Sequence, residues 1–168
     1  MTIQHFNLGP SVVYWDGSNI GYSRDGVNVG IDPKWYDIPS DQYGGQGGAP
    51  SDSQLLGCIA RCQGELTSFE KNIVLRLGSY DPETADLTSG VGEITLPAFG
   101  SFVRQGSYPL GKVLEIRGSN GRIKFPVAFL RNPQDLNLGT RATFYSCGWE
   151  CWVDAASTRK LYEFLAAV

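Results

Sequence analysis

The sequence has little charge and one histidine. Charged residues make up 18% of the 168 residues, and His5 is the single histidine. A Ser-His-Asp or Cys-His mechanism would have to use that residue, close to the N-terminus, and no sequence context around it supports one. The sequence therefore predicts a protein that is not an enzyme and needs no cofactor.

An excess of basic residues and a long apolar run are also lacking. The net charge is −3, which is opposite in sign to the footprint of a nucleic-acid reader, although an acidic surface lets DNA slide past without sticking. No segment approaches the roughly 20 apolar residues that span a bilayer. The first ten residues lack the pattern of a secretory signal. We expect no membrane contact, and a cytosolic product with reduced thiols.

Glycine, proline and hairpin signals are abundant and spread along the chain. The 21 glycines and 9 prolines suit a β protein with many turns. Asp16-Gly17 and Asn120-Gly121 are hairpin signals, and Asp25-Gly26 is a further turn signal. The strands predicted from these signals and from apolar patterning are Ser11–Trp15, Asn19–Tyr22 with Gly26–Ile31, Lys34–Ile38, Cys58–Phe69, Lys112–Arg117, Arg122–Leu130 and Thr140–Asp154.

Side chains alternate along Cys58–Phe69, and the smaller, more apolar set is assigned to the core: Cys58, Ala60, Cys62, Gly64, Leu66 and Ser68. Apolar residues then recur at helical spacing over Glu70–Leu77. A second helix is expected at the C-terminus, capped by Ser157, with an apolar face made of Leu161, Tyr162, Phe164 and Leu165. The predicted fold is a single mainly β domain over residues 1–168, a β-sandwich or distorted β-barrel with a short flanking helix and a C-terminal helix.

A long polar segment interrupts these strands at about residues 39–57. Loops of this length inside a compact domain are uncommon and are usually functional or disordered. Its glycine run is not followed by Lys-Ser/Thr or a helix, which argues against a phosphate loop and favours an arm that orders on assembly. We predict an inter-subunit arm whose contacts are made by Asp41, Tyr43, Gly44, Gly45, Pro50, Leu55 and Leu56.

The four cysteines form two C-x-x-x-C pairs, Cys58/Cys62 and Cys147/Cys151. Positions i and i+4 of one strand lie about 13 Å apart, too far for one zinc ion to bind both. If the two strands pair antiparallel with Cys58 opposite Cys151, cross-strand disulfides come within reach. The leading interpretation is that all four are small buried hydrophobes, with disulfides formed outside the cytosol second and a zinc site third. No metal site is predicted.

Three features of the N-terminal half occur in order: the pattern from Gly9-Pro10 through Gly26-Val27, the D-x-P-S-D-Q-Y-G-G arm, and G-A-P-S-D-S-Q-L-L-G before a long strand ending E-L-T-S-F-E. With these features the chain resembles structural proteins of tailed bacteriophages, and is similar to the tail-tube (major tail protein) group. It is continuous over roughly Gly9–Leu77, and beyond that only strand order and a terminal helix support it.

The resemblance implies a virion protein assembled in the bacterial host cytoplasm as a homo-oligomer of stacked hexameric rings. The arm would reach a neighbouring copy, and the strands near Cys58–Phe69 and Arg122–Leu130 would line a channel through which DNA passes without specific binding. Other virion proteins would be further partners. Two alternatives stay open, namely a capsid cement or head-to-tail connector protein, and a carbohydrate-binding β-sandwich module that uses exposed tryptophans.

Overall fold

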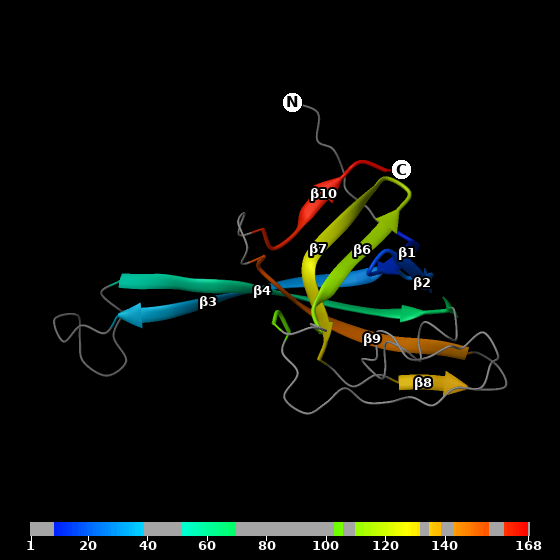
Figure 1. Ribbon diagram of the computed structural model, residues 1–168, viewed down its shortest axis with the longest axis horizontal. Helices are drawn as coiled ribbons and strands as arrows, with labels where there is room; N and C mark the ends of the chain where they lie inside the picture. Colours follow the sequence, from blue (N-terminus) through cyan, green and yellow to red (C-terminus); the bar gives the residue numbers. More distant parts are fainter. Residues whose placement is uncertain are drawn as a thin grey trace.

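The computed structural model describes residues 9–38, 52–69, 103–105, 110–131, 135–138, 143–154 and 160–167. Every regular element in these ranges is a β-strand (Figure 1). The strands are β1 (Ser11–Trp15), β2 (Ser18–Ser23), β3 (Val27–Ile38), β4 (Asp52–Leu66), β5 (Ser68–Phe69), β6 (Lys112–Gly118), β7 (Gly121–Leu130), β8 (Asp135–Leu138), β9 (Thr143–Trp152) and β10 (Glu163–Leu165). The prediction of a mainly β fold is confirmed.

All ten strands belong to one antiparallel sheet with the order β3-β4-β9-β7-β6-β1-β2-β5, and β10 and β8 pair with β7 and β9. The sheet is strongly curved. Trp15 on β1 and Trp149 on β9 lie with ring centroids 6.3 Å apart, although β6 and β7 separate their strands in the order. β4 also leads directly into β5, where Thr67 donates a backbone hydrogen bond of 2.9 Å to the Tyr22 carbonyl.

The sheet stays open, so the closed barrel that was one of the two predicted forms is not observed in the described part of the chain. β3 is the end strand of the order, and the β3–β4 hairpin extends away from the rest of the sheet (Figure 1). A strand that leaves the body in this way cannot close the sheet against β5.

The core fills the concave side of this curved sheet. Its members come from six strands and are fully or almost fully buried: Val13, Ile20, Ala60, Cys62, Leu66, Leu114, Ile116, Ile123, Phe125, Ala128, Leu130, Tyr145, Cys147, Trp149 and Cys151. The predicted core face of β4 is confirmed at Ala60, Cys62 and Leu66, which are buried, while the alternate residues Arg61, Gln63 and Glu65 are exposed. Of the other residues assigned to this face, Cys58 and Gly64 are half-buried and Ser68 is exposed.

Two predicted hairpins are confirmed. Asp16 and Gly17 join β1 to β2 with φ angles of 49° and 81°, the left-handed conformation that a tight two-residue hairpin turn requires. The β6–β7 hairpin also forms, but Gly118 pairs with Gly121. Ser119 and Asn120 therefore occupy the turn, one residue earlier than the Asn120-Gly121 signal predicts.

The predicted C-terminal helix is wrong within residues 160–167. Glu163–Leu165 forms β10, which pairs with β7 and places Phe164 opposite Ile123. Tyr162 packs against the core ring of Phe125 with centroids 6.1 Å apart. Pairing with an existing sheet therefore overrides the helical spacing of the apolar residues. Ser157 and the predicted helix over 70–77 lie outside the described residues.

Candidate functional site: the β3–β4 ribbon and its charged base

The β3–β4 hairpin is a long two-stranded ribbon, paired from Val27↔Gly64 to Ile38↔Asp52. The predicted separation of Gly26–Ile31 from Lys34–Ile38 is wrong, because β3 continues without a break. β4 begins at Asp52, six residues before the predicted start at Cys58, so Leu55 and Leu56 belong to a strand and not to a loop. The pairing shifts between Lys34 and Trp35, which leaves Leu56 as the extra residue of a β-bulge.

The other residues that we predicted to make arm contacts, Asp41, Tyr43, Gly44, Gly45 and Pro50, lie outside the described residues. Their contacts stay a prediction.

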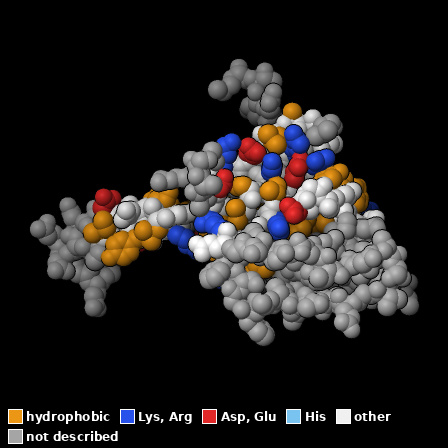
Figure 2. Space-filling view, viewed as in Figure 1, with side chains coloured by type: hydrophobic (Ala, Val, Ile, Leu, Met, Phe, Trp, Pro, Cys, Tyr) orange, Lys and Arg blue, Asp and Glu red, His pale blue; other side chains and the backbone are white. Residues whose placement is uncertain are grey.

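The far half of the ribbon exposes large apolar side chains. Opposed residues share a face, so Trp35 and Leu55, which are 56% and 53% exposed, lie on the same side of the ribbon. Strand alternation puts that side on the continuation of the core face of β4. The apolar residues exposed on the ribbon are Ile31, Trp35, Tyr36, Ile38, Leu55 and Leu56. Figure 2 shows apolar side chains gathered on the ribbon in this view.

The outer edge of β3 is poorly suited to adding another strand. β3 ends the strand order, so among the described residues no strand pairs with that edge. Pro33 lies in the middle of β3, opposite Cys58. Its ring nitrogen has no hydrogen to donate, and a proline within a continuous ladder turns that missing donor toward the free side. A partner is therefore expected to contact the faces of the ribbon instead of extending the sheet.

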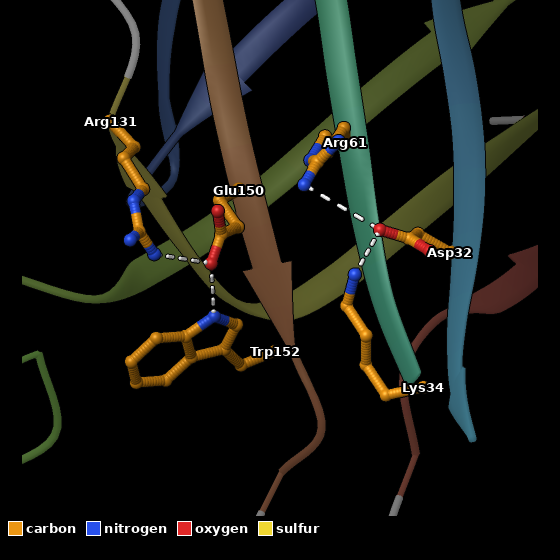
Figure 3. Close-up of polar contacts among 6 residues, drawn as sticks. All are labelled: Asp32, Lys34, Arg61, Arg131, Glu150 and Trp152. Carbon is orange, nitrogen blue, oxygen red and sulfur yellow. Dashed lines mark hydrogen bonds and ion pairs between the residues drawn. The ribbon is translucent and has the colours of Figure 1, made fainter. Parts of the chain in front are cut away.

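Charged side chains form two groups on the opposite face of the sheet, at the base of the ribbon (Figure 3). Asp32 Oδ2 lies 2.6 Å from Lys34 Nζ and 3.5 Å from Arg61 Nη2. The hydrogen bond from Lys34 is the main cause that lowers the pKa of Asp32. On β9, the buried Glu150 accepts hydrogen bonds of 2.9 Å from Arg131 and 2.7 Å from Trp152 Nε1.

A third charged group lies on β6 and β7, and both of its arginines bind the same carboxylate. Arg117 and Arg122 both bond Glu115 Oε1, at 2.9 and 3.0 Å. The Arg117 guanidinium also stacks 3.9 Å from the centroid of the Tyr14 ring. Burial raises the pKa of Glu115, but the bonds from both arginines outweigh it and leave that pKa below its usual value.

The four cysteines are free thiols. The strands pair antiparallel, but two residues away from the register that cross-strand disulfides would need. Ala60 lies opposite Cys151, and Gly64 lies opposite Cys147. Cys62 contacts Cys151 diagonally, with the sulfur atoms 3.8 Å apart. That contact and burial raise the pKa of Cys151, and burial raises the pKa of Cys147. Buried, protonated thiols favour the interpretation as small hydrophobes.

Alkylation of the native protein is therefore expected to modify Cys58 alone, because it is the one cysteine that is not buried. After unfolding without a reductant, all four thiols are expected to react. Intact mass spectrometry of both samples gives the counts directly. Two unreactive cysteines in the unfolded, unreduced protein would show a disulfide and contradict the free-thiol assignment.

The described ranges hold no candidate metal site. Nowhere in them do three His, Cys, Asp or Glu side chains gather closely enough to hold a metal ion. His5 lies outside these ranges. No helix that could cross a membrane is found in the part of the chain that the structure describes. Of the four tryptophans Trp15, Trp35, Trp149 and Trp152, only Trp35 is exposed, which is a poor platform for a carbohydrate.

Comparison with known proteins finds similarity among solved structures. No protein-family model matches the sequence, and no curated protein matches it. Among solved structures, a chain from a structure titled "Virion of native gene transfer agent (GTA) particle" is similar over 93% of this chain and 95% of that chain, with a TM-score of 0.47 and 14% sequence identity.

Proposed function

We propose that the protein is a non-enzymatic structural subunit of a phage-like virion, and that it joins copies of itself through the β3–β4 ribbon. A tail-tube subunit that forms stacked rings around a DNA channel is the specific form of this proposal. The observation that carries it is the apolar surface on the far half of the ribbon, where Trp35, Leu55 and Leu56 are each more than half exposed. The resemblance of Gly9–Leu77 to tail-tube proteins supports the same assignment.

A ribbon with this surface fits repeated contacts better than a single strong one. Completing the burial of one half-exposed side chain is worth about 1 kcal/mol, since full burial is worth about 1.5–3 kcal/mol. The loss of translational and rotational freedom on association offsets much of the sum. In a closed ring each copy both inserts a ribbon and receives one, so two weak contacts per copy act together.

The test is assembly of the purified protein over a range of concentrations, followed by sedimentation velocity and negative-stain electron microscopy. The wild-type protein is expected to form rings or tubes. The variant Trp35→Ser/Leu55→Ser/Leu56→Ser is expected to stay monomeric with an unchanged circular dichroism spectrum, because these side chains contribute little to the core of the monomer.

The matched control is Tyr22→Ser/Phe164→Ser, which removes two exposed aromatic rings away from the ribbon and is expected to assemble as the wild type does. Assembly of the triple variant at wild-type concentrations would show that the ribbon is not the contact. A wild-type protein that is monomeric at every concentration would contradict self-assembly, and binding to preformed capsids would then test the cement or connector role.

A further inference from the structure

The end of the ribbon is acidic as well as apolar. Beyond Lys34, the described residues 35–38 and 52–57 contain two charged residues, Asp37 and Asp52, and both are exposed. Asp37 accepts a hydrogen bond of 2.6 Å from the Ser53 hydroxyl, and Asp52 accepts one of 2.7 Å from the Ser53 amide. Neither carboxylate has a cationic partner among the ion pairs of the described residues. The described part of the ribbon end therefore presents two unneutralised carboxylates beside its apolar side chains. Asp37 pairs with Ser53 and Asp52 pairs with Ile38, so the two carboxylates lie on opposite faces of the ribbon.

This charge argues against a symmetric contact between two ribbon ends. In such an isologous contact the same patch meets itself, which would bring the equivalent carboxylates of two copies together at a surface that excludes water. Like charges juxtaposed at an interface are strongly unfavourable. The ribbon end is better matched by a different, cationic surface on the next copy.

One described surface of the chain fits that requirement, the charged base shown in Figure 3. The side chains of Arg61 and Arg131 are 55% and 60% exposed, and among the described residues each makes a single ion pair. A guanidinium carries five N–H donors, so both arginines keep donors that face solvent. Beside them, the Trp152 ring packs edge-on against Phe129 at 4.8 Å, which adds aromatic surface to the same area.

The two arginines that bind Glu115 are a weaker match. Arg117 and Arg122 share Glu115, and Arg117 is stacked on Tyr14. Their side chains are 34% and 30% exposed. A carboxylate from another molecule would have to displace these contacts to bind there.

We infer that the outer face of β4 and β9 around Arg61 and Arg131 is the surface that receives the Asp37/Asp52 end of the ribbon from the next copy. The contact is heterologous, in which one copy inserts its ribbon and its neighbour supplies the arginines. This inference rests on the proposed function and names the second half of its interface. Heterologous contacts generate rings when the rotation closes and filaments when it does not.

Two variants, each defective in one half of the interface, test the inference. Asp37→Lys/Asp52→Lys changes the ribbon and leaves the arginine face intact. Arg61→Gln/Arg131→Gln changes the face and leaves the ribbon intact, and the amide introduced at position 131 can still donate to the buried Glu150. Each variant alone is expected to need a protein concentration about tenfold or more above that of the wild type to assemble.

Mixing the two variants gives the decisive result. The intact ribbon of one variant and the intact face of the other can form one contact per pair, so sedimentation velocity and native mass spectrometry are expected to show a 1:1 heterodimer without rings. The matched control Arg117→Gln/Arg122→Gln loses the same charge from the Glu115 group and is expected to assemble as the wild type does. Thermal melting of each variant checks that it is folded.

The outcomes separate the inference from the proposed function. If the face variant assembles at wild-type concentrations while the ribbon variant does not, the arginine face is excluded and ribbon-mediated assembly stands. If both variants fail alone and the mixture gives no heterodimer, the heterologous contact is excluded. If the control variant loses assembly to the same extent as the face variant, the effect is one of net charge and the assigned face is wrong. A wild-type protein that never assembles overturns both proposals.

Discussion

Replacing Phe125 with alanine is expected to destabilise the domain by about 3–5 kcal/mol, the usual cost of deleting a buried aromatic ring. Phe125 is fully buried on β7, opposite Leu114 of β6. Its ring also lies 6.1 Å from that of Tyr162, which directly precedes β10. The substitution therefore leaves a cavity where the sheet interior meets the C-terminal segment, and neighbours held in strands can close it only in part.

The matched control is Phe164→Ala, the same substitution at an aromatic residue of β10. Phe164 is 55% exposed and packs edge-on against Tyr162 at 5.3 Å. Its removal is expected to cost about 1 kcal/mol or less. Urea unfolding followed by tryptophan fluorescence measures both values. Equal losses for the two variants would contradict the placement of Phe125 in the core and of Phe164 at the surface.

Local signals are sufficient to predict the hairpins and the faces of strands. Asp-Gly at the β1–β2 turn meets the need for two left-handed residues, and alternation along β4 separates Ala60 and Cys62 from Arg61. Hairpin turns and strand faces depend on residues that are close together in the sequence, so the local residue pattern is enough to predict them. The helical prediction at the C-terminus fails because β10 forms by pairing with β7, a strand far earlier in the chain.

The pairing register of β4 and β9, the strands that carry the cysteines, cannot be predicted from the alternation of their side chains. A shift of two residues between β4 and β9 keeps every side chain on its face, because the strand period is two. Alternation therefore cannot distinguish Cys58 opposite Cys151 from the observed Ala60 opposite Cys151. The pairing that the structure has brings Cys62 and Cys151 into diagonal contact, a relationship with no signature in the spacing of the cysteines.

The sequence indicates where the candidate site lies in the chain, but not the structure that the site adopts. Leu55 and Leu56 stand out in the sequence as apolar residues in a polar segment, and both are exposed on the ribbon. The exposure of Trp35 and Tyr36 has no signal in the sequence, because aromatic residues usually lie in the core, yet both are more than half exposed. The charged base has no local signature, because Arg61 and Glu150 come together only through the β4–β9 register.

Replacing Gly26 with alanine is expected to lower the free energy of unfolding by about 2–5 kcal/mol. Two effects add together, the strain of a left-handed backbone conformation and a steric clash of the new Cβ atom. Gly26 has a φ angle of +82°, and a Cβ atom there would lie 2.8 Å from the carbonyl oxygen of Gly9. Its own carbonyl accepts a hydrogen bond of 2.6 Å from the Ser23 hydroxyl, which resists a change in the turn. An alanine must therefore displace backbone on one side or the other.

Gly17→Ala separates these two effects. Gly17 has nearly the same φ angle, +81°, but a Cβ atom added there would have nothing within 4 Å, so only the conformational cost of about 1–2 kcal/mol is expected. The difference between the two unfolding free energies measures the collision with Gly9. Since Gly26 leads directly into β3, the same collision is expected to shift the root of the ribbon, and Gly26→Ala should weaken assembly whereas Gly17→Ala should not. Equal unfolding free energies for the two variants would show that the backbone at Gly9 moves aside without cost. The turn at Gly26 would then not fix where the ribbon begins.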